Sequence, residues 1–170
     1  MDRIVIIGNS GSGKTHLGQR LSDRFGHPLI HLDELFWEPG GFSIKRPKAL
    51  VFADVARLAE GERWIVEGVF GELAQEFCPR ANHLIWLDLD WTTCEQSLLQ
   101  RGSQSATQQD PQEAEASFER LLAWAAAYPH RDGPRSQRGH RLIFEQFPGD
   151  KTRLTTRTEV ADFVAHLAGG

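Results

Sequence analysis

The stretch "GNSGSGKT" at residues 8–15 contains the residue types that bind phosphate groups. Its spacing matches G-x-x-x-x-G-K-[ST], in which a glycine-rich turn leads to a lysine and a hydroxyl. Glycines allow consecutive backbone N–H groups to point inward around an anion, and a helix that starts there directs its positive dipole end at the same place. The lysine can reach the β and γ phosphates of a nucleoside triphosphate, and the hydroxyl can bind Mg²⁺. A flexible linker would explain the glycines but not the last two residues.

The neighbouring sequence supports a nucleotide site. The apolar run at 4–7 predicts a buried strand, and Leu17, Leu21 and Phe25 recur on one face of a predicted helix. The predicted nucleotide-binding residues are Gly8, Asn9, Ser10, Gly11, Ser12, Gly13, Lys14, Thr15 and His16. Among them, Lys14 is also expected to act in catalysis and Thr15 to bind the metal ion.

Strand and helix patterns alternate along the rest of the chain. The predicted strands are 4–7, 28–32, 63–68, 83–90 and 151–156. After the first helix, further helices are predicted to begin at Pro47, near Asp110 and at Ser136, and Thr92 and Thr158 are the predicted caps of two more. Such alternation predicts an α/β fold with a parallel sheet covered on both faces. Ligands of these folds bind beyond the carboxyl ends of the strands.

Length and composition predict a single cytoplasmic domain over residues 1–170. Of the 170 residues, 40% are apolar and 25% charged, so one core can form without metal or disulfide support. Cys78 and Cys94 lack metal-binding spacing and are expected to be free thiols in a reducing compartment. The sequence shows no secretory leader and no apolar run of membrane-spanning length. We therefore expect no membrane partner, and either a monomer or a homodimer.

Charge is distributed unevenly in the sequence. The net charge of −4 and the pI near 6.0 make nucleic acid an unexpected partner. Residues 131–157 nevertheless contain seven Lys or Arg against three acids, which could form a phosphate-facing patch or an ordinary solvated helix face. By contrast, "GSQSATQQ" at 102–109 is small, polar and without Lys or Arg, and it predicts a mobile lid over about residues 102–112.

The chain resembles the adenylate-kinase-related branch of P-loop proteins, and within it the small bacterial proteins labelled topology-modulation proteins. The resemblance lies in "IVIIGNSGSGKT", "HLDELFWEPGG", "WIVEGVF", "LIWLDLD" and "RLTTRTEVADFV", which together span nearly the whole chain in order. It implies a three-layer P-loop NTPase fold, adenylate-kinase-like, with a lid and a five-stranded parallel sheet of order 2-3-1-4-5. It also implies ATP and Mg²⁺ as cofactors and a small-molecule acceptor.

Three acids end predicted strands at the edge where a ligand is expected. Asp33 matches the acid that orients the acceptor hydroxyl or a Mg²⁺ water in kinases of this fold, so we predict catalysis and substrate binding, with a loop cap as the alternative. Glu67 resembles the acid of an Asp-Gly motif in nucleoside monophosphate kinases, which implies metal and substrate binding. The arginine after that motif is absent from "EGVFGEL", which argues against a nucleoside monophosphate acceptor. Asp88 resembles a metal ligand but could be structural.

Arginines near the site could stabilise the transferring phosphate, because phosphoryl transfer depends mainly on positioning and on neutralising negative charge. Arg101 and Arg131 flank the lid region and its following helix, and we predict that both act in catalysis. Further predicted acceptor-binding residues are Trp37, Arg46, Arg135 and Arg138. The alternatives are a core position for the tryptophan and a solvated helix start for Arg46.

The sequence therefore predicts a kinase that transfers the γ-phosphate of Mg-ATP to a small molecule. Two other functions stay open: a nucleotide-dependent, DNA-associated regulator that uses residues 131–157, and a simple ATPase with water as the acceptor. A lid favours the kinase, because excluding water suppresses the competing hydrolysis.

Overall fold

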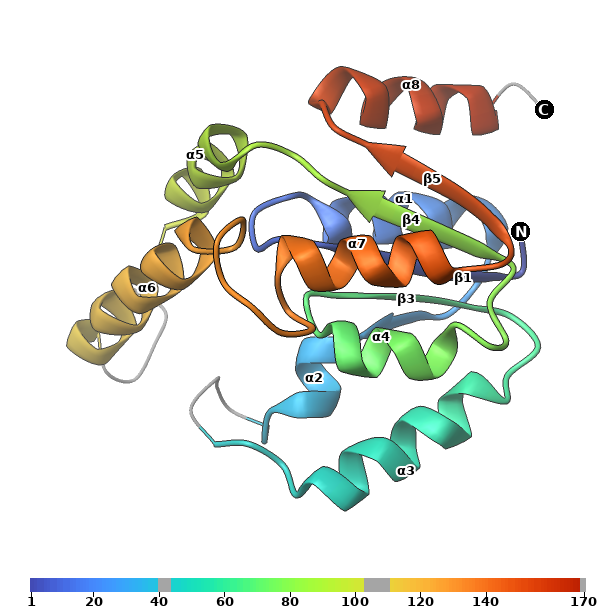
Figure 1. Ribbon diagram of the computed structural model, residues 1–170, viewed down its shortest axis with the longest axis horizontal. Helices are drawn as coiled ribbons and strands as arrows, with labels where there is room; N and C mark the ends of the chain where they lie inside the picture. Colours follow the sequence, from blue (N-terminus) through green and yellow to red (C-terminus); the bar gives the residue numbers. More distant parts are fainter. Residues whose placement is uncertain (40–43, 103–110, 169–170) are drawn as a thin grey trace.

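The computed structural model describes residues 1–39, 44–102 and 111–168, which form a parallel sheet with helices on both faces (Figure 1). The strands in this part of the chain are β1 (Arg3–Gly8), β2 (Leu29–His31), β3 (Trp64–Gly68), β4 (His83–Leu87) and β5 (Asp150–Leu154). Their order is β2-β3-β1-β4-β5, and every pairing is parallel. The predicted α/β class and strand order are confirmed. Most of the predicted lid, 103–110, lies outside the described residues.

The helices cover the two faces of the sheet and its carboxyl edge. On one face lie α1 (Lys14–Phe25) and α8 (Arg157–Ala168), and on the other lie α4 (Gly71–Phe77) and α7 (Gln137–Gln146), with α3 (Lys48–Ala59) packed on α4. Towards the carboxyl ends of the strands lie α2 (Leu32–Phe36), α5 (Trp91–Arg101) and α6 (Pro111–Ala126) (Figure 1). None of the helices in the described residues is long and apolar enough to cross a membrane.

Strand β1 forms the centre of the core. Ile4 and Ile6 point to the face covered by α1, whereas Val5 and Ile7 point to the face covered by α4 and α7. All four side chains are fully buried because the faces of a strand alternate and both faces are covered here. The loop that follows β1 therefore starts from a rigid position in the middle of the sheet.

Two short helices were not predicted from the sequence. Helix α2 occupies the start of the segment expected to be a loop after β2, and α4 follows β3 directly. Both contain too few residues to show the repeated apolar spacing that reveals a helix. Together they place Phe36, Phe70 and Glu72 beside one another at the edge of the sheet, as described below.

Two of the predicted helix caps were wrong by two residues. Helix α5 is capped by Asp90, whose carboxylate accepts a hydrogen bond from the Thr93 N–H at 2.8 Å. The Thr156 hydroxyl accepts from the Glu159 N–H at 3.1 Å at the start of α8. Helix α8 therefore begins at Arg157, which brings this side chain to the edge that carries the glycine-rich loop.

A buried series of hydrogen bonds ties the end of α6 and helix α7 to the sheet. The Trp86 indole N–H donates to the Tyr128 hydroxyl at 3.2 Å, and this hydroxyl lies 2.7 Å from Nδ1 of His140. Nε2 of the same imidazole lies 3.0 Å from the Val69 carbonyl oxygen. A carbonyl can only accept, so Nε2 of His140 carries a proton. Burial lowers the pKa of His140 to about 3.

We predict that His140 lowers the stability of the protein as the pH falls from 7 to 5.5. In the unfolded chain its imidazole takes up a proton near the ordinary pKa of about 6.5, whereas the folded protein keeps it neutral. Protonation therefore favours unfolding, by about 1 kcal/mol over this interval. Urea unfolding of the wild type and of His140→Gln at both pH values measures the effect. An equal pH dependence in the two proteins would contradict it.

Candidate active site

The loop at residues 8–13 wraps around the side chain of Lys14. The ammonium group is buried and donates to the Asn9 carbonyl oxygen at 2.7 Å. Burial lowers the pKa of Lys14, although the negative charges of Glu67 and Asp33 oppose this shift. A cation is thus held inside the loop, at the start of α1, where the sequence motif predicts the phosphates of a nucleotide.

Asn9 also connects the loop to helix α6. Its side-chain Nδ2 donates to the Ala125 carbonyl oxygen at 2.9 Å, and its Oδ1 accepts from the Ser10 N–H at 2.8 Å. Residue 9 is 2% exposed, so this link is closed to solvent. His16, in contrast, is exposed in the first turn of α1.

The loop is packed closely against α5. Gly11 has a φ of 78°, and a Cβ atom there would lie 2.4 Å from the Cys94 carbonyl oxygen and 2.8 Å from Cγ of Leu98. No side chain fits in that space, and the positive φ disfavours one as well. The glycine is therefore required by contact with α5 as well as by the turn.

Glu67, near the end of β3, joins the first turn of α1 to β2. Its Oε1 accepts from the Thr15 hydroxyl at 3.0 Å and lies 2.7 Å from Nδ1 of His31. Burial acts to raise the pKa of Glu67, but the hydrogen bond with His31 and the charge of Lys14 outweigh it and hold the pKa below its ordinary value. The same hydrogen bond raises the pKa of His31. An ionised carboxylate thus lies against the threonine that is predicted to bind Mg²⁺.

Asp33 lies in the first turn of α2 at the same edge of the sheet. Burial raises the pKa of its carboxyl group; the charge of Lys14 opposes this shift and that of Glu67 adds to it. Across 1–39, 44–102 and 111–168, this carboxylate has no hydrogen-bond or ion-pair partner. A carboxylate with a raised pKa and a free oxygen can accept a proton from a substrate hydroxyl.

Asp88 is held by other elements of the fold. Its carboxylate accepts from Nε2 of Gln137 at 2.8 Å and from Nε and Nη2 of Arg153 at 2.9 and 2.5 Å. These contacts attach α7 and β5 to the end of β4, which is the structural role that the sequence left open. Within the described residues, no hydrogen bond joins Asp88 to Thr15 or Glu67, and its role as a metal ligand stays a prediction.

Arg135 and three aromatic residues form a cluster at the end of α2, the helix that also carries Asp33. The guanidinium group pairs with the Glu72 carboxylate and lies 4.5 and 4.4 Å from the ring centroids of Phe36 and Phe70. The Trp37 ring meets Phe36 edge-on, with the centroids 4.8 Å apart. Aromatic rings and a paired cation therefore lie at the end of α2, in the part of the chain where the acceptor is predicted to bind.

The other predicted arginines differ in their surroundings. Arg131 donates to the Trp124 and Arg135 carbonyl oxygens and lies 3.5 Å from the Trp124 ring centroid; burial lowers its pKa to about 10. Arg46, two residues before α3, donates to Asp54 within that helix at 2.7 Å. Arg101 ends α5. Its positive charge acts to lower the pKa values of both Lys14 and Asp33, although burial leaves that of Asp33 raised overall. Of the three arginines, Arg101 is the one whose charge acts on both Lys14 and Asp33.

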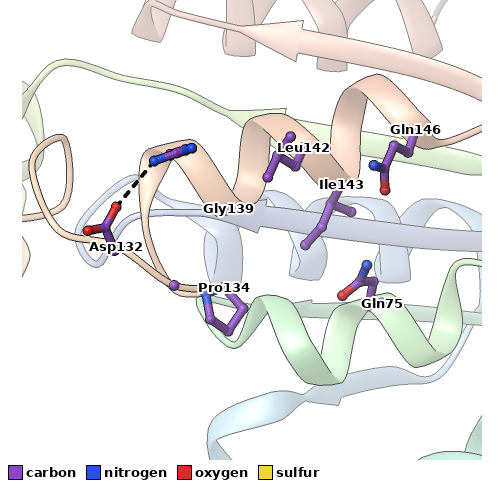
Figure 2. A pocket seen from close by; sticks show the side chains of 9 residues that line it. Gln75, Asp132, Pro134, Gly139, Leu142, Ile143 and Gln146 are labelled. Carbon is purple, nitrogen blue, oxygen red and sulfur yellow. Dashed lines mark ion pairs between the residues drawn. The ribbon is translucent and has the colours of Figure 1, made fainter.

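Arg138 lies apart from the glycine-rich loop. It forms a 3.5 Å ion pair with Asp132 and lines a groove of about 450 Å³. Figure 2 shows this groove between α4 and α7. Leu142 and Ile143 line the same groove, but no residue of the loop at 8–13 does. The structure therefore separates Arg138 from the residues that surround Lys14.

Two further residues contact the site but were not among the predicted site residues, although the loop near 155–157 was expected to border the nucleotide base. His31 is the hydrogen-bond partner of Glu67, and its place two positions before Asp33 in "HLDELFWEPGG" was a usable signal. Arg157 donates to the carbonyl oxygens of Gly11 and Ser12 at 2.9 and 2.6 Å. It comes from the far end of the chain, and no local motif connects it to the loop.

Comparison of the sequence with curated proteins finds a similar enzyme. No protein-family model matches the chain. The chain is similar to shikimate kinase from Symbiobacterium thermophilum, with 31% identity over 103 residues that cover 51% of this chain and 58% of that protein. The match thus spans a little more than half the length of this curated relative.

Solved structures match over nearly the whole chain. Shikimate kinase from Bacteroides thetaiotaomicron gives a TM-score of 0.52 at 18% identity, covering 99% of this chain and 96% of that one. A gluconokinase from Sinorhizobium meliloti 1021 gives 0.51 at 18% identity, covering 99% and 94%. The chain has the fold of P-loop small-molecule kinases. The narrower resemblance to topology-modulation proteins stays a prediction.

We predict that Gly11→Ala destabilises the protein more than Gly26→Ala does. Both glycines have positive φ, so each substitution costs about 1–2 kcal/mol of backbone strain. Gly26 has no atom within 4 Å of an added Cβ, whereas at Gly11 the new methyl group collides with α5. Urea unfolding measures the two losses in the free energy of unfolding. Equal losses would show that α5 does not constrain the loop.

Proposed function

We propose that the protein is a kinase that transfers the γ-phosphate of ATP to a hydroxyl group of a small molecule. One observation carries the proposal: Asp33 and Glu67 lie close enough to Lys14, at one edge of the sheet, for both carboxylates to act on the pKa of Lys14 and for its charge to act on the pKa values of both. A protein that only binds nucleotide has no use for the free carboxylate of Asp33. The fold supports the proposal, because shikimate kinase and gluconokinase are named as kinases of small molecules.

The residues around the loop fit a magnesium nucleotide. The Ser12 hydroxyl is buried without a hydrogen-bond partner in the described residues, and it can donate to a phosphate oxygen. Thr15 and Glu67 would hold Mg²⁺, since a hydroxyl and an ionised carboxylate are the oxygen ligands that this ion prefers. When bound, Mg²⁺ neutralises negative charge on the β and γ phosphates.

The proposed catalytic roles follow from the surroundings of each group. Lys14 would move its hydrogen bond from the Asn9 carbonyl to phosphate oxygens. Asp33 would orient the acceptor hydroxyl and accept its proton as the hydroxyl oxygen attacks the γ-phosphorus, while the bond from this phosphorus to the β–γ bridging oxygen breaks and ADP leaves. This role is suited to its raised pKa. Arg101, whose charge already acts on both groups, would neutralise the transferring phosphoryl group.

The basic stretch does not favour a DNA-associated regulator. Arg135 and Arg153 are paired with carboxylates, and Arg131 and Arg157 donate to backbone carbonyls. Carboxylates thus balance the charges of Arg135 and Arg153, and all four side chains spend hydrogen-bond donors on the protein itself, so they are not a row of open donors for a nucleic-acid backbone. The simple ATPase is distinguished by the assay below.

We predict that the wild type forms ADP from Mg-ATP faster when one of a panel of hydroxyl-bearing metabolites is added. Lys14→Ala should abolish ADP formation because the phosphates lose their buried cation, whereas Lys48→Ala, on the exposed side of α3, should not. A coupled assay measures ADP, and thermal unfolding checks that both variants fold. Steady ADP release that no metabolite accelerates would indicate an ATPase. Full activity in Lys14→Ala would refute the assigned site.

We predict that Asp33→Asn slows transfer by about 100-fold or more, the range expected for loss of a general base. ATP affinity should change little, because the role proposed for Asp33 is on the acceptor and not on the nucleotide. Glu34→Gln is the matched control, since this exposed neighbour lies on the same short helix. Single-turnover transfer and calorimetric ATP binding separate the two effects. Equal losses in both would assign Asp33 a structural role.

A further inference from the structure

We propose that Arg157 positions the phosphate-binding loop; this inference rests on the proposed nucleotide binding. Its Nη1 donates to the Ser12 carbonyl oxygen at 2.6 Å, and Nη2 donates to the Gly11 carbonyl oxygen at 2.9 Å and to Oγ of Ser97 at 2.6 Å. The guanidinium group therefore bridges the loop and α5. Its backbone is fixed at the start of α8, where the Thr156 hydroxyl caps the helix.

These contacts determine which way the loop amides point. In a trans peptide the C=O and N–H groups point in opposite directions, and no cis peptide occurs in the described residues. Holding the carbonyls of Gly11 and Ser12 therefore turns the N–H groups of Ser12 and Gly13 away from Arg157. The Ser12 N–H indeed donates to the Asn9 carbonyl oxygen at 3.2 Å, on the inner side of the loop. The Gly13 N–H is turned the same way, towards the place predicted for phosphate.

Arg157 also brings a positive charge that no carboxylate balances. Arg135 and Arg153 form ion pairs with acids, whereas the hydrogen-bond acceptors of Arg157 in the described chain are two carbonyls and a hydroxyl, all neutral. Its Nη1 would lie 2.5 Å from a Cβ atom at Gly13, so the charge stands at the N-terminus of α1. A cation there opposes the helix dipole. The arrangement becomes favourable when an anion shares the site.

Arg157 would thus orient the loop amides and add positive charge, and both effects act on phosphate groups. This role differs from contact with a nucleotide base. A residue that orients loop amides acts on any polyphosphate, whereas a residue that contacts the base acts on nucleotides alone. Inorganic tripolyphosphate, which has no base, therefore distinguishes the two. Lysine at position 157 keeps the charge but cannot bridge two carbonyls as a guanidinium does.

The test is calorimetric titration of the folded protein with Mg-ATP and with magnesium tripolyphosphate. Arg157→Gln should weaken both ligands by about tenfold or more, which is the loss expected from removing charge-assisted hydrogen bonds. Arg157→Lys should recover only part of this loss. Arg20→Gln, the same change on the exposed face of α1, should leave both affinities unchanged. Thermal unfolding of each variant confirms that it folds.

Each other outcome overturns the inference. Loss of ATP affinity alone in Arg157→Gln would assign the residue to the base, and wild-type affinity in Arg157→Lys would show that charge suffices without the bridge. An unfolded Arg157→Gln alongside a folded Arg157→Lys that binds both ligands normally would leave only a structural role. A wild type that binds neither ligand would instead refute the proposed function, so the two failures are distinguishable.

Discussion

The burial of the Lys14 ammonium is the constraint on which the rest of the site depends. A buried cation is unstable unless polar groups and negative charge surround it. Here the Asn9 carbonyl supplies the direct contact, and Glu67 and Asp33 supply the charge. Glu67 belongs to β3 and Asp33 to α2. The negative charge around Lys14 is therefore supplied only when β3 and α2 both reach the carboxyl edge of the sheet. The sheet order places β3 directly beside β1 and thereby meets that requirement.

The two acids near Lys14 are kept chemically different by their partners. Glu67 accepts hydrogen bonds and is held ionised, whereas Asp33 has none in the described chain and a raised pKa. Two carboxylates around one cation can therefore serve two purposes, one as a fixed negative charge and the other as an exchangeable proton acceptor. His31 is the residue that makes this difference, because it contacts only one of the two acids through a hydrogen bond.

Local sequence predicted the strands, their parallel arrangement and the loop around Lys14, because each is marked by an apolar run or by a motif of fixed spacing. Helices α2 and α4 are too short to show a periodic pattern of apolar residues. The cap of α5 could have been Asp90 or Thr92 by residue type, and the structure shows that the Asp90 side chain accepts from the Thr93 N–H. Contacts between distant residues were also hidden. Arg157 and Arg153 look alike in the sequence, yet one donates to the loop and the other to Asp88.

The hydrogen bond from Asn9 to the Ala125 carbonyl gives the loop a mechanical connection to α6. Residue 9 also offers its own carbonyl to Lys14, so one residue connects the buried cation to a helix far along the sequence. A ligand that draws the ammonium away from this carbonyl alters the energy of holding α6 in place. Thermodynamic linkage makes the relation mutual: the factor by which a ligand changes the equilibrium for displacing α6 is also the factor by which that displacement changes the ligand's affinity.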